Sequence, residues 1–100
     1  MPYQSKLQSP DLDRLFEAIL TLESVEELYR FMEDLTTIQE LKEMGQRFHV
    51  ASLLDRKLPY HKIAETTSAS TATISRVNKS LVYGAGGYRL ALDRLQKESE

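Results

Sequence analysis

The chain has 100 residues, a formal net charge of −2 at pH 7 and no cysteine. This length predicts a single small domain, and the lack of cysteine excludes disulfide bonds and thiolate metal ligands. No apolar run approaches the roughly 20 residues that span a bilayer. The polar start MPYQSKLQSPD lacks the hydrophobic region of a signal peptide. We therefore expect a cytoplasmic protein without a membrane partner.

The charges are unevenly distributed along the chain. Residues 1–54 carry five basic and ten acidic side chains, whereas residues 55–89 carry six basic and two acidic ones. The second segment therefore has a local charge of +4, although a window of this charge also arises by chance. Because the local field decides whether a surface meets phosphates, the negative total does not exclude nucleic acid as a partner.

Helix signals dominate the first half of the chain, and no strand-like alternation interrupts them. Ser9 and Pro10 predict the start of a first helix, in which apolar residues recur from Leu12 to Leu20. Residues 24–27 and 37–40 both have the spacing of a capping box, which predicts the starts of two further helices.

Two residues suggest boundaries before the second half. Gly45 predicts a break in the third helix, followed by a fourth helix over residues 46–56. Pro59 then separates that helix from the rest, because the residue before a proline is pushed out of the helical region. Since several of these amphipathic helices are too short to be stable alone, they need partners, and a second copy of the chain is the favoured one. The alternative is that their apolar stripes pack within one chain.

Residues 59–82 predict a helix-turn-helix. The first helix, residues 61–66, turns Ile63 and Ala64 inward, and the small residues 67–69 form the turn. Ser68 stands where glycine is commonest in such turns, a geometry that serine adopts at modest cost. Ser70 is the expected N-cap of the second helix, which runs to residue 81. Its buried stripe is Ile74, Val77 and Leu81.

Small polar side chains lie near the start of this second helix, where a recognition helix meets base edges and phosphates. Hydroxyl groups donate to or accept from base edges, and methyl groups contact thymine methyls. Polar side chains of the first helix would lie near phosphates. The candidate DNA-binding residues are Tyr60, His61, Lys62, Thr71, Ala72, Thr73, Ser75, Arg76 and Lys79. The alternatives are a solvated face on a structural helix and a helix-turn-helix that contacts proteins.

The sequence offers little for an enzyme. His49 and His61 are the only histidines, and neither has metal-ligand spacing such as HExxH. No GxSxG-type motif is present. The glycine-rich residues 83–88 lack the lysine and preceding strand of a phosphate loop, and a connector before a last helix over residues 89–97 is favoured. We therefore expect no catalytic residue, no metal and no enzyme activity.

Several motifs together resemble the Trp-repressor superfamily, and most closely its YerC/YecD branch of Trp-repressor-like proteins. They are residues 35–40, 45–47, 53–54, Tyr60, 63–64, 72–76, Asn78 and 83–86. The resemblance implies an all-α fold of about six helices and an intertwined homodimer whose helix-turn-helix pair docks in successive major grooves. Residues 1–100 would form one DNA-binding domain, with dimerisation helices in 1–58, the helix-turn-helix in 59–82, and a connector and C-terminal helix in 83–100.

The resemblance also implies an effector pocket. In the tryptophan repressor, L-tryptophan lies between two arginines, which match Arg47 and Arg76. The full candidate effector pocket is Thr37, Arg47, Thr73, Arg76 and Ser80. Val77 stands where the tryptophan repressor has a glycine, and we expect its branched side chain to fill the space that the indole needs. The expectation is therefore against tryptophan, and a different small effector stays open.

These observations predict a homodimeric, sequence-specific DNA-binding transcriptional regulator, acting as a repressor, with double-stranded DNA as its partner. The alternative is a helical protein-protein interaction module whose helix-turn-helix does not bind DNA.

Overall fold

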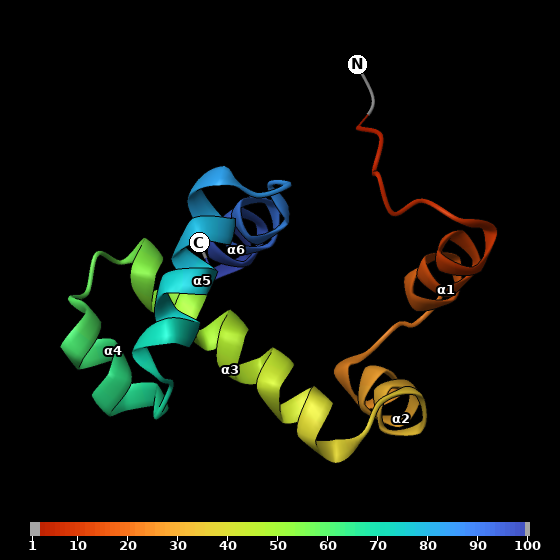
Figure 1. Ribbon diagram of the computed structural model, residues 1–100. Helices are drawn as coiled ribbons and strands as arrows, with labels where there is room; N and C mark the ends of the chain where they lie inside the picture. The colour runs from red at the N-terminus through yellow and green to blue at the C-terminus, as the bar shows by residue number, and fades with distance from the viewer. Residues whose placement is uncertain (1–2, 100) are drawn as a thin grey trace. The chain divides into compact units, whose positions relative to one another are not determined.

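A computed structural model describes residues 3–99 of the chain, so residues 1, 2 and 100 of the predicted 1–100 domain lie outside the described residues. The described part forms six α-helices and no strand (Figure 1). This confirms the predicted all-α class with about six helices. The helices are α1 (Pro10–Leu20), α2 (Val25–Leu35), α3 (Ile38–Asp55), α4 (Tyr60–Thr67), α5 (Thr71–Tyr83) and α6 (Gly87–Ser99).

The chain divides into two compact units at the start of α3. The N-terminal unit extends to Ile38 and contains α1 and α2, and the C-terminal unit begins at Gln39 and contains α3 to α6. The division also separates charge: residues 1–38 carry three basic and eight acidic side chains, and residues 39–100 carry ten basic and seven acidic ones. The N-terminal unit therefore has a formal charge of −5 and the C-terminal unit one of +3.

Side-chain caps begin both helices of the N-terminal unit, as their sequence predicts. The Ser9 hydroxyl accepts a hydrogen bond from the Leu12 amide at 3.1 Å, and the Ser24 hydroxyl accepts one from the Glu27 amide at 3.1 Å. The Glu27 carboxylate reaches back to accept from the Glu23 amide at 2.8 Å. These bonds satisfy amides that have no partner inside the helix. Even so, neither helix buries a residue.

The predicted break at Gly45 is wrong, because α3 runs without interruption from Ile38 to Asp55. A glycine inside a helix costs about 1 kcal/mol relative to alanine, but it keeps its N–H and C=O groups and does not remove a rung of the helix. The predicted fourth helix over residues 46–56 is therefore the second half of α3, which supplies the buried residues Val50, Ala51, Leu53 and Leu54.

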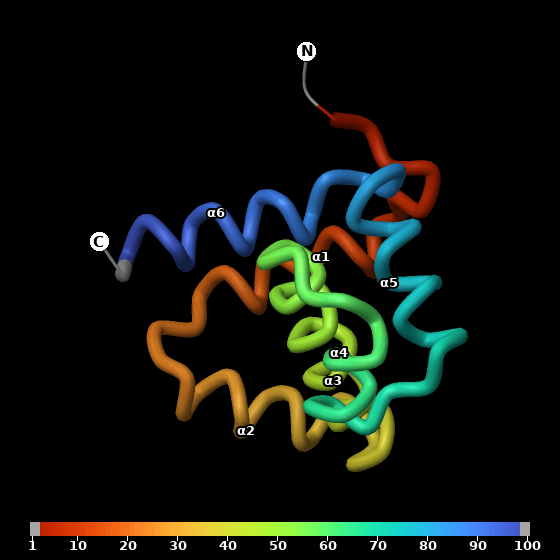
Figure 2. The backbone as a smooth tube through the Cα atoms, turned by 90° about the vertical axis from the view of Figure 1, so that its left-hand side faces the viewer, coloured from red at the N-terminus to blue at the C-terminus, as the bar shows by residue number. Residues whose placement is uncertain are grey.

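The hydrophobic core of the C-terminal unit forms around this half of α3, and α4, α5 and α6 lie about it (Figures 1 and 2). Each of these three helices contributes apolar side chains at helical spacing. The buried residues outside α3 are Ile63, Ala69, Ile74, Val77 and Leu92. Leu81, the third member of the predicted stripe, is half-buried against this core.

The helix-turn-helix forms where the sequence predicts it, with small shifts of its bounds. Helix α4 extends one residue further at both ends, to Tyr60 and Thr67. Ser68 adopts the left-handed conformation (φ 63°) that the turn requires. Helix α5 continues two residues beyond the predicted end, to Tyr83, because the chain turns only at Gly84. A side chain on Gly84 would collide with the carbonyl oxygen of Ser80, so glycine is required there.

Helix α6 also begins two residues earlier and ends two residues later than predicted, at Gly87 and Ser99. Of the three leucines of this helix, Leu92 is buried, whereas Leu90 and Leu95 are each about half exposed. The helix therefore buries a narrower stripe in the core than its sequence suggests.

Candidate nucleic-acid interface

The start of α5 is fixed by a small network of hydroxyl groups. The Ser70 hydroxyl accepts a hydrogen bond from the Thr73 amide at 3.1 Å and donates to the Thr73 hydroxyl at 3.0 Å. Ser70 is thus the N-cap that the sequence predicts. Thr73 is half-buried and engaged in this network, so of the predicted base-contacting side chains it is the least free to reach outward.

The remaining predicted residues of α5 share one exposed face. Ile74 and Val77, at 0% and 2% exposure, hold the opposite side of the helix in the core. Because residues three and four apart lie on the same side of a helix, the polar positions between the buried ones turn to solvent. The exposed members are Thr71, Ala72, Ser75, Arg76 and Lys79.

Helix α4 contributes its N-terminal turn to the candidate interface. Tyr60 is 39% exposed, and His61 and Lys62 are exposed. Pro59 is the N-cap residue and forms no side-chain capping bond. Since the first amides of a helix lack partners within it, this turn, together with the positive charge of the exposed Lys62, suits a phosphate.

The basic side chains of these two helices are not neutralised by neighbours. Among the residues that the structure describes, no hydrogen bond or ion pair involves the side chain of Lys62, Arg76 or Lys79. Three of the six basic residues of segment 55–89 are therefore available on α4 and α5, with Glu65 as the acidic residue of these helices.

Arg89 also lies in the positively charged segment 55–89, but its guanidinium is paired with carboxylates of α3 and α6. Its guanidinium donates to both carboxylate oxygens of Asp55, at 2.6 and 3.0 Å, and to Asp93 at 2.9 Å. These hydrogen bonds hold the pKa of the Asp55 carboxyl below its ordinary value and raise the pKa of Arg89. Arg89 thus ties the start of α6 to the end of α3.

The candidate effector pocket is divided between the two units. Thr37 belongs to the N-terminal unit, whereas Arg47, Thr73, Arg76 and Ser80 belong to the C-terminal unit. Arg47 is half-buried on α3, and Arg76 and Ser80 are exposed on α5. The pocket as a whole stays a prediction.

Val77, on which the expectation against tryptophan rests, is a member of the core of the C-terminal unit. Its side chain packs inward with Ile74 and Ile63, and little of its surface is open to a ligand. Whether this side chain excludes an indole stays a prediction.

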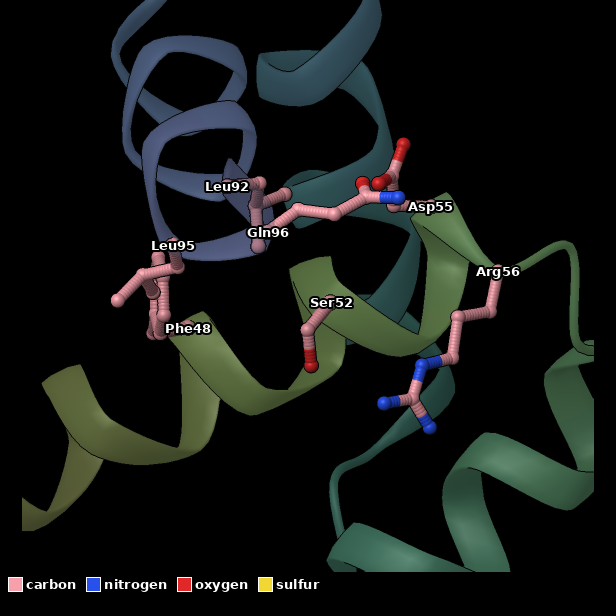
Figure 3. Close-up of a pocket in the computed structure, with 7 residues that line it drawn as sticks. All are labelled: Phe48, Ser52, Asp55, Arg56, Leu92, Leu95 and Gln96. Carbon is pink, nitrogen blue, oxygen red and sulfur yellow. The ribbon is translucent and has the colours of Figure 1, made fainter. Parts of the chain in front are cut away.

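A cleft of about 430 Å³ lies between α3 and α6 (Figure 3). Phe48 and Leu95 lie together at one end, Gln96 extends toward Asp55, and the Arg56 side chain points away from this group. The lining combines apolar side chains with a carboxylate already bound by Arg89. None of the lining residues belongs to the predicted DNA-binding or effector sets.

Two polar contacts of the C-terminal unit were not anticipated from the sequence. One is the Asp55–Arg89 pair, and the other is a hydrogen bond from the Gln46 side chain to the carbonyl oxygen of Thr67, at 3.1 Å across 21 positions of the chain. Residues 45–47 carry part of the resemblance to known proteins, but spacing alone does not reveal which carbonyl Gln46 contacts.

Within residues 3–99, no helix is long and apolar enough to cross a membrane. Over the same described part of the chain, no group of three or more His, Cys, Asp or Glu side chains could hold a metal ion.

Comparison with known proteins connects this arrangement to one family. The family model described as Trp repressor protein matches residues 10–96. The uncharacterized protein YerC of Bacillus subtilis (strain 168) is 52% identical over 95 residues, covering 95% of this chain and 90% of that protein.

Two solved structures agree closely with the fold. A TrpR-like protein from Eubacterium eligens ATCC 27750 gives a TM-score of 0.88 at 49% identity and covers 91% of this chain and 94% of its own. A putative Trp repressor from Staphylococcus aureus gives a TM-score of 0.87 at 46% identity and covers 91% of both chains. A family match of this length, with relatives of such identity over nearly the whole chain, shows that the chain belongs to the Trp repressor family.

Proposed function

We propose that this protein is a transcriptional regulator that binds DNA sequence-specifically as a homodimer and represses by occupying its operator. The observation that carries the proposal is the exposed face of α5, in which Arg76 and Lys79 have no partner among the described residues and the opposite side is fixed in the core. Membership of the Trp repressor family supports it, as does a relative described as a putative Trp repressor.

The two helices divide the work of recognition. Lys62 and the hydroxyl of Tyr60, at the start of α4, bind phosphates and set the register of the protein on the duplex. Thr71, Ala72 and Ser75 meet base edges from α5, and Arg76 binds a guanine or a phosphate. Lys79 and His61 add phosphate contacts. With DNA as its partner, we expect the protein to act in the cytoplasm without catalysis.

A second copy of the chain is the partner that the N-terminal unit requires. Helices α1 and α2 have 11 residues each, a length at which isolated helices are marginal, and bury no residue. Phe16 is 55% exposed, Leu20 83% and Tyr29 60%. Because exposed apolar stripes of this kind mark protein-protein surfaces, these helices are best explained as the dimerisation region.

The proposal includes no tryptophan effector, because Val77 is packed in the core. We expect a calorimetric titration with L-tryptophan to give no saturable heat. A clear binding isotherm would show that the pocket opens despite Val77.

The DNA proposal is tested by selecting bound sequences from random double-stranded DNA and then measuring Arg76→Ala on the selected site. Enrichment of a palindrome is the expected result for a two-fold dimer. Arg76→Ala should weaken binding to the selected site by roughly 1–3 kcal/mol if it reads a guanine. If it binds a phosphate, it should lower the slope of log affinity against log salt concentration by about one.

Arg14→Ala is the matched control, since Arg14 is an exposed arginine in the N-terminal unit whose side chain pairs with Glu17 of its own helix. This variant should bind the selected site as the natural chain does. If no sequence is enriched, or if Arg76→Ala leaves the affinity unchanged, the alternative gains: a helical interaction module whose helix-turn-helix does not bind DNA.

A further inference from the structure

The end of α4 at Thr67 and the turn that follows it, residues 68–70, set the direction in which α5 leaves α4. Within this segment, the Thr67 hydroxyl donates to the Ile63 carbonyl at 2.8 Å and accepts from the Ala69 amide at 3.1 Å. The Ser68 amide donates to the Ala64 carbonyl at 2.9 Å. These bonds fix the internal shape of the turn, but they all lie within the helix-turn-helix itself.

Gln46 connects this turn to another helix. Its side-chain amide, projecting from the middle of α3, donates to the backbone carbonyl of Thr67 at 3.1 Å. That carbonyl belongs to the last turn of α4, where carbonyl groups have no partner within the helix. Both Gln46 and Thr67 are half-buried, so water competes less for the bond than at an exposed site.

The position of the bond matters for α5. Ser68 is held in a left-handed conformation, and Ala69 inserts into the core directly before the Ser70 cap. The hydrogen bond at Thr67 therefore restrains the segment that leads into α5. The buried Ile74 and Val77 restrain the middle of that helix.

We propose that Gln46 is a positioning residue for DNA recognition: it holds the helix-turn-helix turn against α3, so that α5 is presented in one orientation. The inference rests on the proposed function. Base-edge contacts depend on this orientation far more steeply than contacts to phosphates, because directional hydrogen bonds weaken with small changes of angle.

The test is Gln46→Met, which keeps the length and flexibility of the side chain and removes the donor. Affinity for the selected site should fall roughly three- to tenfold, the range that corresponds to a single net hydrogen bond. Affinity for random-sequence DNA and the salt dependence of binding should stay unchanged, since no phosphate contact is lost. Gln39→Met is the matched control, because the Gln39 side chain is exposed and, among residues 3–99, its amide bonds only to Glu43 on the same helix.

Three results would overturn the positioning role. Unchanged affinity for the selected site would show that the tether does not matter. An equal loss on selected and random DNA would point to general damage. A salt slope lower by about one would make Gln46 a direct phosphate contact.

A measurement on the natural chain keeps the proposal testable if Gln46→Met does not fold. The side-chain amide protons of Gln46 should exchange with solvent more slowly than those of Gln39 in a nuclear magnetic resonance experiment, and equal exchange would disprove the tether. If the natural chain enriches no DNA sequence, the proposed function itself has failed, and slow Gln46 exchange would then identify a structural bond without a role in recognition.

Discussion

At the scale of single residues, the least expected feature is the pair formed by Asp55 and Arg89. Asp55 ends α3 and Arg89 lies in the first turn of α6, so two hydrogen bonds join helices that are separated by the entire helix-turn-helix. The bidentate arrangement adds geometric specificity to charge attraction. Although both side chains keep contact with solvent, their hydrogen bonds favour the ionised form of Asp55.

This pair predicts a pH-dependent contribution to stability. Because the pKa of Asp55 is lower in the folded protein than its ordinary value of 3.8, its contribution is complete above that value and is lost as the pH falls through the folded pKa. We expect Asp55→Asn to lower the free energy of unfolding at pH 7, and the difference from the natural chain to shrink below about pH 4. Urea denaturation across about pH 2.5–7 measures this difference in the free energy of unfolding, because that range brackets the titration of an aspartate carboxyl. A difference independent of pH would contradict the role of ionisation.

At the scale of helices, short-range sequence rules predict where a helix begins better than where it is interrupted. Ser9, Ser24 and Ser70 all cap helices as their sequence predicts, because each capping bond spans only three positions. Gly45 was misleading, since glycine lowers helix propensity without preventing a helix whose neighbours pack in the core. The bonds of Gln46 and Arg89 could not be predicted, because they depend on how helices pack across 21 and 34 positions.

The capping network of α5 gives a prediction at this scale. Ser70→Ala should lower the free energy of unfolding by about 1 kcal/mol, because the Thr73 amide loses its acceptor. Ser75→Ala, on the exposed face of the same helix, should change the free energy of unfolding by less than about 0.5 kcal/mol. Urea denaturation of both variants, with DNA binding measured alongside, separates the two roles. Equal stability losses would show that the cap is not specific to Ser70.

The residues of the candidate site likewise divide into those that short-range sequence rules predict and those that they do not. The exposed face of α5 follows from helical periodicity, so Thr71, Ser75 and Arg76 lie where the sequence suggests. Thr73 differs because its hydroxyl bonds to Ser70, a contact within the cap that periodicity does not describe. The effector set requires residues from both units, and periodicity within one helix carries no information about such a grouping.

At the scale of the whole molecule, the two units differ in how much they bury. All nine residues of the described hydrophobic core belong to the C-terminal unit, while α1 and α2 bury none. A unit without a core of its own gains stability by covering its apolar stripes, and for this reason we attribute dimerisation to it.

We therefore expect sedimentation equilibrium at micromolar concentration to give about twice the chain mass of 11.5 kDa. Phe16→Asp, which places a charge on the exposed apolar stripe of α1, should shift the protein toward the monomer because burying an unpaired carboxylate is costly. Arg14→Ala, a substitution of an exposed charged residue on the same helix, should remain dimeric. A monomeric natural chain would refute the dimerisation role of these helices.

The separation of charge between the units has a consequence for how such proteins are identified. The isoelectric point of about 5.7 reflects a net charge of −2, in which a segment of charge −5 outweighs one of charge +3. Screens that look for DNA-binding proteins by a high isoelectric point, above about 9, would discard this chain. A count taken over each compact unit, rather than over the whole polypeptide, would draw attention to its positively charged unit.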